Sequence, residues 1–237
     1  MKILIHTPVS NRAWILPEFL AALAAQNVPI GVELEYLFDV NDTQDNSREI
    51  LDNFVPPSVR RIEEHPWPSL LMADHEWSIE RYRRMILLRN NALALAKHVG
   101  ARFLFSIDSD VILDDPQTLK HLIETDVPVI AGVFMATWGN PDATPLPNVW
   151  QRGQNEMTDE FLMGIETAPE HVKVGGLGAC TLIRRDVWEA GVTYDPIDNL
   201  PSDYRGEDRY FCIRAAVTGI PLLACSHRRI RHVDRTI

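Results

Sequence analysis

Residues 103–111 have the sequence Phe103-Leu104-Phe105-Ser106-Ile107-Asp108-Ser109-Asp110-Val111, in which a bulky apolar run ends at two acids. The apolar residues predict a β-strand that is buried on both faces, as in a parallel sheet between helices. Both carboxylates then lie at the carboxyl edge of that strand, where open α/β sheets bind ligands. Paired carboxylates there need a cation to offset their desolvation. A divalent metal carrying a phosphorylated ligand fits the pattern, and a solvated acidic turn is the simple alternative.

Strand and helix patterns alternate through the first 135 residues. Apolar runs predict strands at 1–6, 32–38, 59–63 and 127–135, and apolar residues at helical spacing predict helices near 16–26, 78–99 and 114–124. The alternation predicts an α/β fold with a mostly parallel central sheet and helices on both faces. Arg89 falls in the middle of the apolar arc of the 78–99 helix. A guanidinium in that position must snorkel out or reach a charged partner.

The pattern changes after residue 135. Residues 136–170 hold several prolines and few periodic apolar residues, which predicts a long functional or mobile loop. A strand is predicted over 173–184, entered through a glycine-rich stretch at 175–178 that either admits a ligand closely or forms a plain bend. Glu207 and Asp208 open a predicted helix, where the helix dipole alone would favour acids. A strand at 221–225 precedes a tail with His227 and His232, of which at most one can face a given site.

Length and composition limit the class of protein. At 237 residues and 46% hydrophobic, the chain can bury one good core. No apolar run approaches the roughly 20 residues that span a bilayer, and no leader pattern precedes the first strand, so we expect a cytoplasmic protein without a transmembrane segment. A net charge of −10 argues against nucleic acid as the main partner, whereas local arginine clusters suit a small phosphorylated ligand. The three cysteines follow no metal-ligand spacing and are expected to be buried thiols.

Four segments together resemble one family. Thr7-Pro8-Val9-Ser10-Asn11-Arg12 is similar to an opening P-x-x-N-R loop, and Arg89-Asn90-Asn91-Ala92 with Asp108-Ser109-Asp110 resembles an R-N-x-A and D-x-D pair. The glycines at 175–178 with Arg184-Arg185 and Gly206-Glu207-Asp208 resemble a G-G-x-G, R-R and G-E-D series, which His232 follows. This order resembles the nucleotide-sugar glycosyltransferases of the GT-A fold, most closely the inverting family 2 type.

The resemblance implies a single GT-A domain over 1–237, with a nucleotide-binding half at 1–135 and an acceptor-binding half at 136–237 that includes a flexible loop at 136–170. It implies a UDP- or GDP-sugar donor, a saccharide or other hydroxyl acceptor, and inversion. Mn²⁺ or Mg²⁺ would be held by Asp110, Asp108 and His232. Asp208 would be the catalytic base, with Glu207 able to share that role.

The resemblance also implies which residues contact the donor nucleotide. They are Thr7, Pro8, Asn11, Asp39, Arg89, Asp108, Ser109 and Gly176. Either Asp39 or Asn41 could bind the base, and Asp39 is preferred because it directly follows the buried strand.

Three other functions remain open at this point. Retaining mannosyltransferases with a similar GT-A core also combine an R-N helix, a D-x-D and a C-terminal histidine. A sugar-nucleotide nucleotidyltransferase would use a similar sheet, but it usually has a glycine-rich loop after the first strand, and the loop at 7–12 has no glycine. A non-catalytic sugar-binding module would need neither the metal acids nor the Glu207-Asp208 pair.

Overall fold

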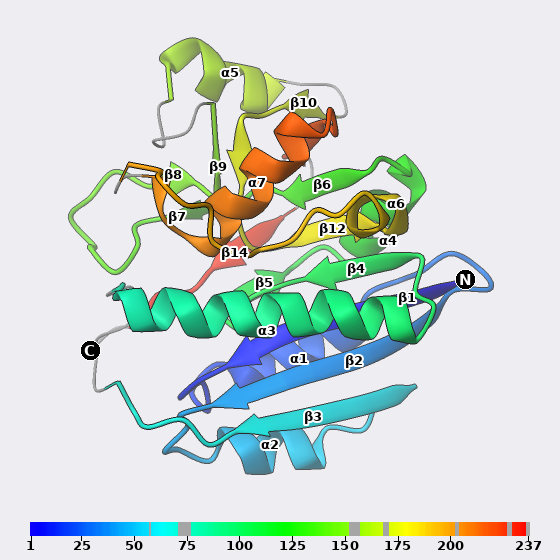
Figure 1. Ribbon diagram of the computed structural model, residues 1–237. Helices are drawn as coiled ribbons and strands as arrows, with labels where there is room; N and C mark the ends of the chain where they lie inside the picture. Colours follow the sequence, from blue (N-terminus) through cyan, green and yellow to red (C-terminus); the bar gives the residue numbers. More distant parts are fainter. Residues whose placement is uncertain are drawn as a thin grey trace.

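The central sheet of the computed structural model joins segments from the whole chain (Figure 1). The structure describes residues 1–56, 58–70, 77–151, 157–167, 171–201, 204–226 and 229–235. In these ranges eight strands form one sheet in the order β10-β13-β6-β12-β4-β1-β2-β3. Their bounds are β1 (Lys2–Val9), β2 (Glu33–Asn41), β3 (Val59–His65), β4 (Phe103–Ser106), β6 (Val129–Gly132), β10 (Val172–Lys173), β12 (Thr181–Arg184) and β13 (Leu222–Cys225).

The sheet is mostly parallel, as predicted. Strands β3, β2, β1 and β4 run in one direction, and β6 and β13 run the same way. Strand β12 lies antiparallel between β4 and β6, and β10 is antiparallel to β13 at the edge. The reversal brings the start of β12 to the edge where β1, β2, β4 and β6 end.

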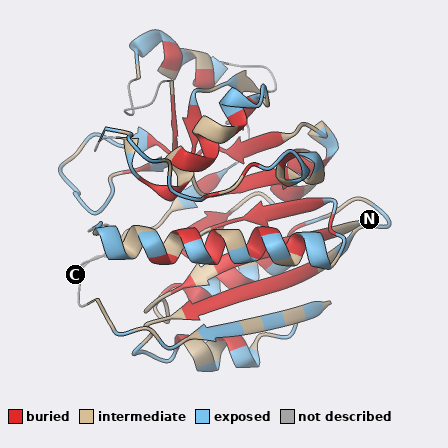
Figure 2. Cartoon of the chain, viewed as in Figure 1, coloured by how far each residue is buried: buried red, intermediate tan, exposed pale blue. Residues whose placement is uncertain are grey.

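Helices cover both faces of the sheet, because successive side chains of a strand point to opposite faces. Ile3, Ile5 and Phe105 pack in one core cluster with the helices α1 (Leu16–Ala24), α2 (Ser47–Asn53) and α4 (Thr118–Thr125). Leu4 and Leu104 pack in the other with α3 (Ile79–His98), α5 (Asp159–Thr167), α6 (Arg185–Glu189) and α7 (Glu207–Val217). Figure 1 shows α3 in front of the sheet and α1 behind it, and in Figure 2 the buried residues of α3 alternate with exposed ones.

Three small ribbons shape the carboxyl edge of the sheet. They pair β5 (Val111–Leu113) with β14 (Ile230–His232), β7 (Met135–Ala136) with β8 (Leu146–Pro147), and β9 (Val149–Trp150) with β11 (Gly176–Leu177). The run at 103–111 is therefore divided: β4 ends at Ser106, the two acids lie in the turn that follows, and β5 begins a new pairing with the tail. The tail lies against the acidic turn for that reason.

Two expectations about the second half need correction. Residues 136–170 are not a loop throughout, because their described part contains β8, β9 and α5, whose Phe161 and Ile165 are buried in a core cluster. Residues 173–184 form three short strands, β10 to β12, in place of one, because β11 leaves the central sheet to pair with β9 and Cys180, with a left-handed φ of 53°, precedes β12. His227 lies outside the described residues. Among the helices that the structure describes, none is both long and apolar enough to cross a bilayer.

Candidate functional site

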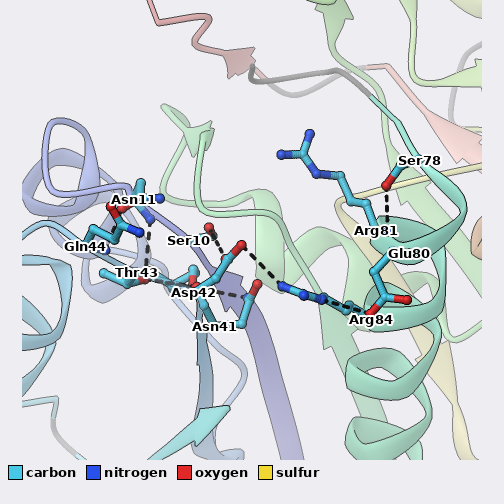
Figure 3. A network of polar contacts seen from close by, with 11 residues as sticks. Ser10, Asn11, Asn41, Asp42, Thr43, Gln44, Ser78, Glu80, Arg81 and Arg84 are labelled. Carbon is cyan, nitrogen blue, oxygen red and sulfur yellow. Dashed lines mark hydrogen bonds and ion pairs between the residues drawn. The ribbon is translucent and has the colours of Figure 1, made fainter. Parts of the chain in front are cut away.

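The loops that follow β1 and β2 are tied together at the carboxyl edge (Figure 3). Ser10 Oγ donates to Asp42 Oδ1 at 2.7 Å, and Asn11 Oδ1 accepts from the backbone N–H of Gln44 at 2.8 Å. Asn11 adopts a left-handed φ of 52°, which asparagine tolerates better than bulkier residues. The side chain of Asn11 therefore joins two loops and is not in the walls of the two cavities described below, and its contact with the nucleotide stays a prediction.

A cavity of about 170 Å³ opens between these loops and α3. Three arginines line it, and we call it the arginine cavity; its other polar walls are Ser10, Asn41, Asp42, Asp108, Ser109, Asp110 and His232, and Pro8 also lines it. Arg84 is buried, with Nη1 3.4 Å from Asp42 Oδ2 and its guanidinium 5.4 Å from the Trp67 ring. Arg12 and Arg81 are the other two. The guanidinium groups of this cavity suit a phosphorylated ligand, and Pro8 and Ser109, expected to contact the nucleotide, are part of its wall.

Asp110 and His232 lie next to each other in this cavity. Asp110 is 7% exposed, and its Oδ1 is 3.9 Å from His232 Nε2, while its Oδ2 is 3.1 Å from Arg12 Nη2. The antiparallel pairing of His232 with Val111 in β14 and β5 brings the tail to this place. The family resemblance led us to expect His232 beside Asp110, and the pairing of these two distant strands is what brings them together.

Arg89 reaches a charged partner, the second of the two outcomes that the sequence left open. Its guanidinium is 2% exposed and donates from Nη2 to Asp108 Oδ1 at 2.7 Å, and from Nη1 to Ser106 Oγ. Burial alone would lower the pKa of Arg89, but the carboxylates of Asp108 and Asp208 raise it. Arg89 therefore remains a cation behind the acidic turn and orients Asp108.

A second cavity, of about 370 Å³, lies on the other side of Asp108. We call it the carboxylate cavity, because Glu207 and Asp208 from the first turn of α7 line it; its apolar walls are Tyr82, Leu146, Pro147, Trp150 and Met157. Burial raises the pKa of both acids, and Asp208 further raises that of Glu207, while Arg89 opposes the rise at Asp208. Carboxyl groups with raised pKa values are suited to exchange protons near neutral pH.

The two cavities adjoin. They share Trp77, Met85, Asp108, Trp138 and Ala179 in their walls. A ligand can therefore lie across both, with its charged end among the arginines and its other end beside Asp208. Asp108 stands at the junction.

Gly176 and Gly178, which precede β12, pack against different side chains. A Cβ at Gly176 would lie 2.1 Å from Trp150 Cε2, so Gly176 is needed for packing under the indole and does not line either cavity. The expected contact of Gly176 with the nucleotide stays a prediction. A Cβ at Gly178 would lie 2.6 Å from Asp208 Oδ2, and Gly178 does line the carboxylate cavity.

Gly178→Ala is expected to lower turnover about 100-fold while leaving the free energy of unfolding nearly unchanged, because the methyl group pushes aside the end of one side chain. Gly176→Ala is expected to lower the free energy of unfolding by about 1–3 kcal/mol, since it overpacks the indole of Trp150. Denaturant titration and turnover assays of the two variants check this. Equal effects of both variants on unfolding would contradict the distinction.

Asp39 is enclosed between two histidines. It is fully buried, and its oxygens pair with His6 Nε2 at 2.8 Å and His65 Nε2 at 2.7 Å. Asn41, the alternative to Asp39 for binding the base, lines the arginine cavity, and binding of the base by either residue stays a prediction. Thr7 is also fully buried, and its contact with the nucleotide stays a prediction.

Asp39, Glu63 and His65 form a second group of potential metal ligands, whose ligand atoms lie within 4.8 Å of one another. The group lies at the ends of β2 and β3. Hydrogen bonds from the two histidines already satisfy Asp39, so this group is explained without an ion.

The buried His6 predicts a pH-dependent stability. Burial lowers its pKa from 6.5, although Asp39 opposes the shift, so below about pH 6.5 the unfolded chain binds a proton that the folded chain does not. Stability therefore falls on acidification through that range, by up to about 1.4 kcal/mol per pH unit. His6→Gln should show a shallower fall than the unmodified chain in denaturant titrations from pH 7.5 to 5. The exposed His98→Gln is the control, and a slope unchanged in His6→Gln would contradict the prediction.

Several cavity residues were not predicted from the sequence as site residues. They are Arg12, Arg84, Trp138, Gly178 and Asn148. The arginine cluster at 81–89 was a signal for Arg84, because Arg81 and Arg84 are three residues apart and therefore lie on the same face of a helix. Trp138 had no such signal, since it lies in a segment without periodicity.

Comparisons with known proteins identify a family for this chain. The family model described as glycosyltransferase family 25, N-terminal domain, matches residues 1–140, whereas the motifs above were likened to family 2. A glycosyltransferase 25 family member from Drosophila melanogaster is 29% identical over 142 residues, 56% of this chain and 23% of the relative. Procollagen galactosyltransferase 1-A of Xenopus laevis is 31% identical over 137 residues, 54% of this chain and 22% of the relative. An inactive family member 3 of Mus musculus is 44% identical over 55 residues, 23% of this chain and 9% of the relative.

Solved structures share the fold. Staphylococcus aureus TarS 1-349 in complex with UDP-GlcNAc matches with a TM-score of 0.63 and 18% identity, over 100% of this chain and 60% of that one. The mannosyltransferase PcManGT from Pyrobaculum calidifontis, in complex with GDP-Man and Mn²⁺, matches with a TM-score of 0.64 and 13% identity, over 98% of this chain and 57% of that one. The chain spans less than a quarter of the length of the curated relatives named here. With the family model matched over 140 of its residues and the sheet order described above, the chain belongs to glycosyltransferase family 25 and has the GT-A fold.

Proposed function

We propose that this chain is a metal-dependent glycosyltransferase that moves a sugar from a nucleoside diphosphate sugar to a hydroxyl acceptor, with inversion. The observation that carries the proposal is the pair of adjoining cavities that meet at Asp108. One of them offers arginines and Asp110 with His232 to a diphosphate. The other offers carboxyl groups of raised pKa to a hydroxyl group. Membership of family 25 supports the same reaction class.

The residues around Asp110 fit a divalent metal. The 3.9 Å between Asp110 Oδ1 and His232 Nε2 is too long for a hydrogen bond but is within the span of two ligands of one ion, each about 2.1 Å from it. A carboxylate and an imidazole suit Mn²⁺, and an oxygen-rich set with the diphosphate also suits Mg²⁺. Asp110 and His232 would hold the ion, with Asp108 nearby. When bound, it would neutralise charge on the two phosphates of the leaving group.

The chain's own groups would then position the donor and accept a proton. In the arginine cavity, Arg12 and Arg84 would pair with phosphate oxygens, and Asn41 or Asp42 would meet the nucleoside. Asp208 would take the proton of the acceptor hydroxyl as its oxygen bonds to the anomeric carbon. The bond from that carbon to the phosphate oxygen breaks, and its electron pair stays with the diphosphate. Glu207 would share the proton, because the two acids are adjacent in one buried turn.

The two halves of the chain would bind different substrates. We propose that residues 1–135 bind the nucleotide and that residues 136–237 bind the acceptor, because the carboxylate cavity takes Pro147, Trp150 and Asp208 from the second half. Residues 136–150 would then select the acceptor.

A donor screen tests the function. Calorimetry with UDP-galactose, UDP-GlcNAc and GDP-mannose, each with and without Mn²⁺, should show one donor whose binding requires the metal. The sugars are chosen from what the names of the relatives and neighbours state. Release of the nucleoside diphosphate and the anomeric configuration of the product by NMR complete the test. Since one relative is named inactive, turnover must be measured as well as binding.

The outcomes separate the other functions. Pyrophosphate release from a nucleoside triphosphate and a sugar phosphate would show a nucleotidyltransferase, and a product with retained configuration would contradict direct displacement. Binding of a free sugar without any sugar nucleotide would show a sugar-binding module.

A further inference from the structure

Trp138 occupies the junction of the two cavities. It lines both of them, and its side chain is 45% exposed. Its backbone adopts a left-handed φ of 53°, which is uncommon for a bulky residue. A residue persists in that conformation only where its surroundings hold it there. The neighbours of Trp138 should therefore include a group that fixes this turn.

Asp234, two residues beyond His232, supplies that group. Its Oδ2 accepts from Thr137 Oγ1 at 2.9 Å, and its Oδ1 accepts from the backbone N–H of Gly139 at 3.2 Å. Asp234 thus bonds the residues on both sides of Trp138. The same Oδ1 lies 3.4 Å from His232 Nδ1, at ion-pair distance.

Ring contacts join the same elements. The imidazole of His232 stacks on Phe134 at 5.6 Å between centroids, and the indole of Trp138 tilts against it at 5.5 Å. The carboxylate of Asp234 and the ring of Phe134 therefore connect His232 to Trp138. A displacement of His232 must therefore disturb the position of Trp138, and the reverse.

We propose that Trp138 is the surface on which the ring of the transferred sugar lies, and that Asp234 is a positioning residue that holds Trp138 and His232 together. The proposal rests on the proposed function. The transferred sugar must lie between the diphosphate and the catalytic base, hence at the junction of the arginine and carboxylate cavities. An indole offers a rigid apolar face to the C–H side of a pyranose ring. Phe134 contacts the rings of both His232 and Trp138, and Asp234 contacts His232 and the two neighbours of Trp138.

Paired ligands test the role of Trp138. UDP with UDP-galactose, or GDP with GDP-mannose, is titrated by calorimetry in Mn²⁺ against the unmodified chain and Trp138→Ala. The variant should bind the sugar nucleotide about 10-fold more weakly and the nucleoside diphosphate equally well. Trp77→Phe is the comparison, because Trp77 also lines both cavities. Equal losses for both ligands, or a selective loss only in Trp77→Phe, would overturn the role of Trp138.

A double-mutant cycle tests the role of Asp234. Asp234→Ala should weaken sugar-nucleotide binding about as much as Trp138→Ala, and the double variant should lose little more, because Asp234 acts through Trp138. Additive losses would overturn the coupling. Asp234→Ala should also lower the affinity for Mn²⁺ alone by about 10- to 100-fold, measured by electron paramagnetic resonance. Asp142→Ala removes an exposed carboxylate from the same segment and should change none of these values.

A spectroscopic readout separates this proposal from the proposed function. The fluorescence of Trp138 is obtained as the difference between the chain and Trp138→Phe, and acrylamide quenches it. Asp234→Ala should raise the quenching constant of that difference at least twofold, and an unchanged constant would overturn the positioning role. If neither sugar nucleotide binds the unmodified chain, the proposed function and the stacking role both fall, while the quenching result still decides whether Asp234 holds Trp138.

Discussion

Asp208→Asn is expected to bind the sugar nucleotide with unchanged affinity and to lose about 100- to 10,000-fold in transfer rate, the range typical of general base removal. The amide has nearly the shape of the carboxylate, so the carboxylate cavity keeps its form. The amide, however, cannot accept the proton of the acceptor hydroxyl. Calorimetry for the donor and single-turnover rates for transfer separate the two effects.

The acid side of the pH–rate profile gives a second measure of the same residue. Burial raises the pKa of Asp208 above the usual 3.8, so the base is protonated, and the rate falls, at a higher pH than for an ordinary aspartate. Glu207→Gln removes the adjacent carboxyl group and should change the profile less than Asp208→Asn. Near-normal turnover in Asp208→Asn would show that another group is the base.

Asp110→Ala is expected to abolish the metal dependence of donor binding, with a loss of more than about 100-fold in affinity for Mn²⁺. Removal of an outer-sphere partner typically costs about 10- to 100-fold, and a direct ligand should cost more. His232 alone would then remain of the pair at 3.9 Å. Titration of Mn²⁺ and of the donor, each in the presence and absence of the other, measures this.

Because Arg12 lies next to Asp110, the effect of Asp110→Ala is best measured as the change in nucleotide affinity on adding the metal. Arg12 Nη2 lies 3.1 Å from Asp110 Oδ2, so the substitution also removes a carboxylate that offsets the charge of Arg12 beside the expected diphosphate. Metal-free binding of the nucleotide can rise for that reason, even as the metal effect disappears. Asp142→Ala, which removes an exposed carboxylate outside both cavities, is the matched control. A normal Mn²⁺ titration in Asp110→Ala would show that the acidic turn does not bind the ion.

The sequence predicted the parts of the site that depend on local pattern. The apolar run before Asp108 predicted its place at a strand end, and the acids at 207–208 were predicted at a helix start. The placement of Arg89 on an apolar helix face allowed two outcomes, and the buried pair with Asp108 is one of them. Predicting these features requires only the periodicity of apolar residues in a strand or helix and the rule that ligands bind at the carboxyl edge of the sheet.

Tertiary structure decided the features that depend on which atoms meet. Asp39 follows a buried strand, as a base-binding residue would, but His6 and His65 from the two neighbouring strands enclose it. Gly176 and Gly178 look alike in the sequence, and only the packing of Trp150 and Asp208 against them shows their different roles. Thr7 and Asn11 were assigned from a motif, and burial and a bond to the next loop remove them from the cavity walls.

The sequence by itself determined an α/β sheet with two acids at its carboxyl edge, because apolar periodicity is a property of consecutive residues. The tertiary structure alone shows the 3.9 Å between His232 and Asp110, which only a family resemblance had suggested, and shows that Asp234 bonds both neighbours of Trp138, because these contacts join residues about a hundred positions apart. Strand pairing and loop closure bring such residues together, and neither is encoded in the spacing of neighbours along the chain.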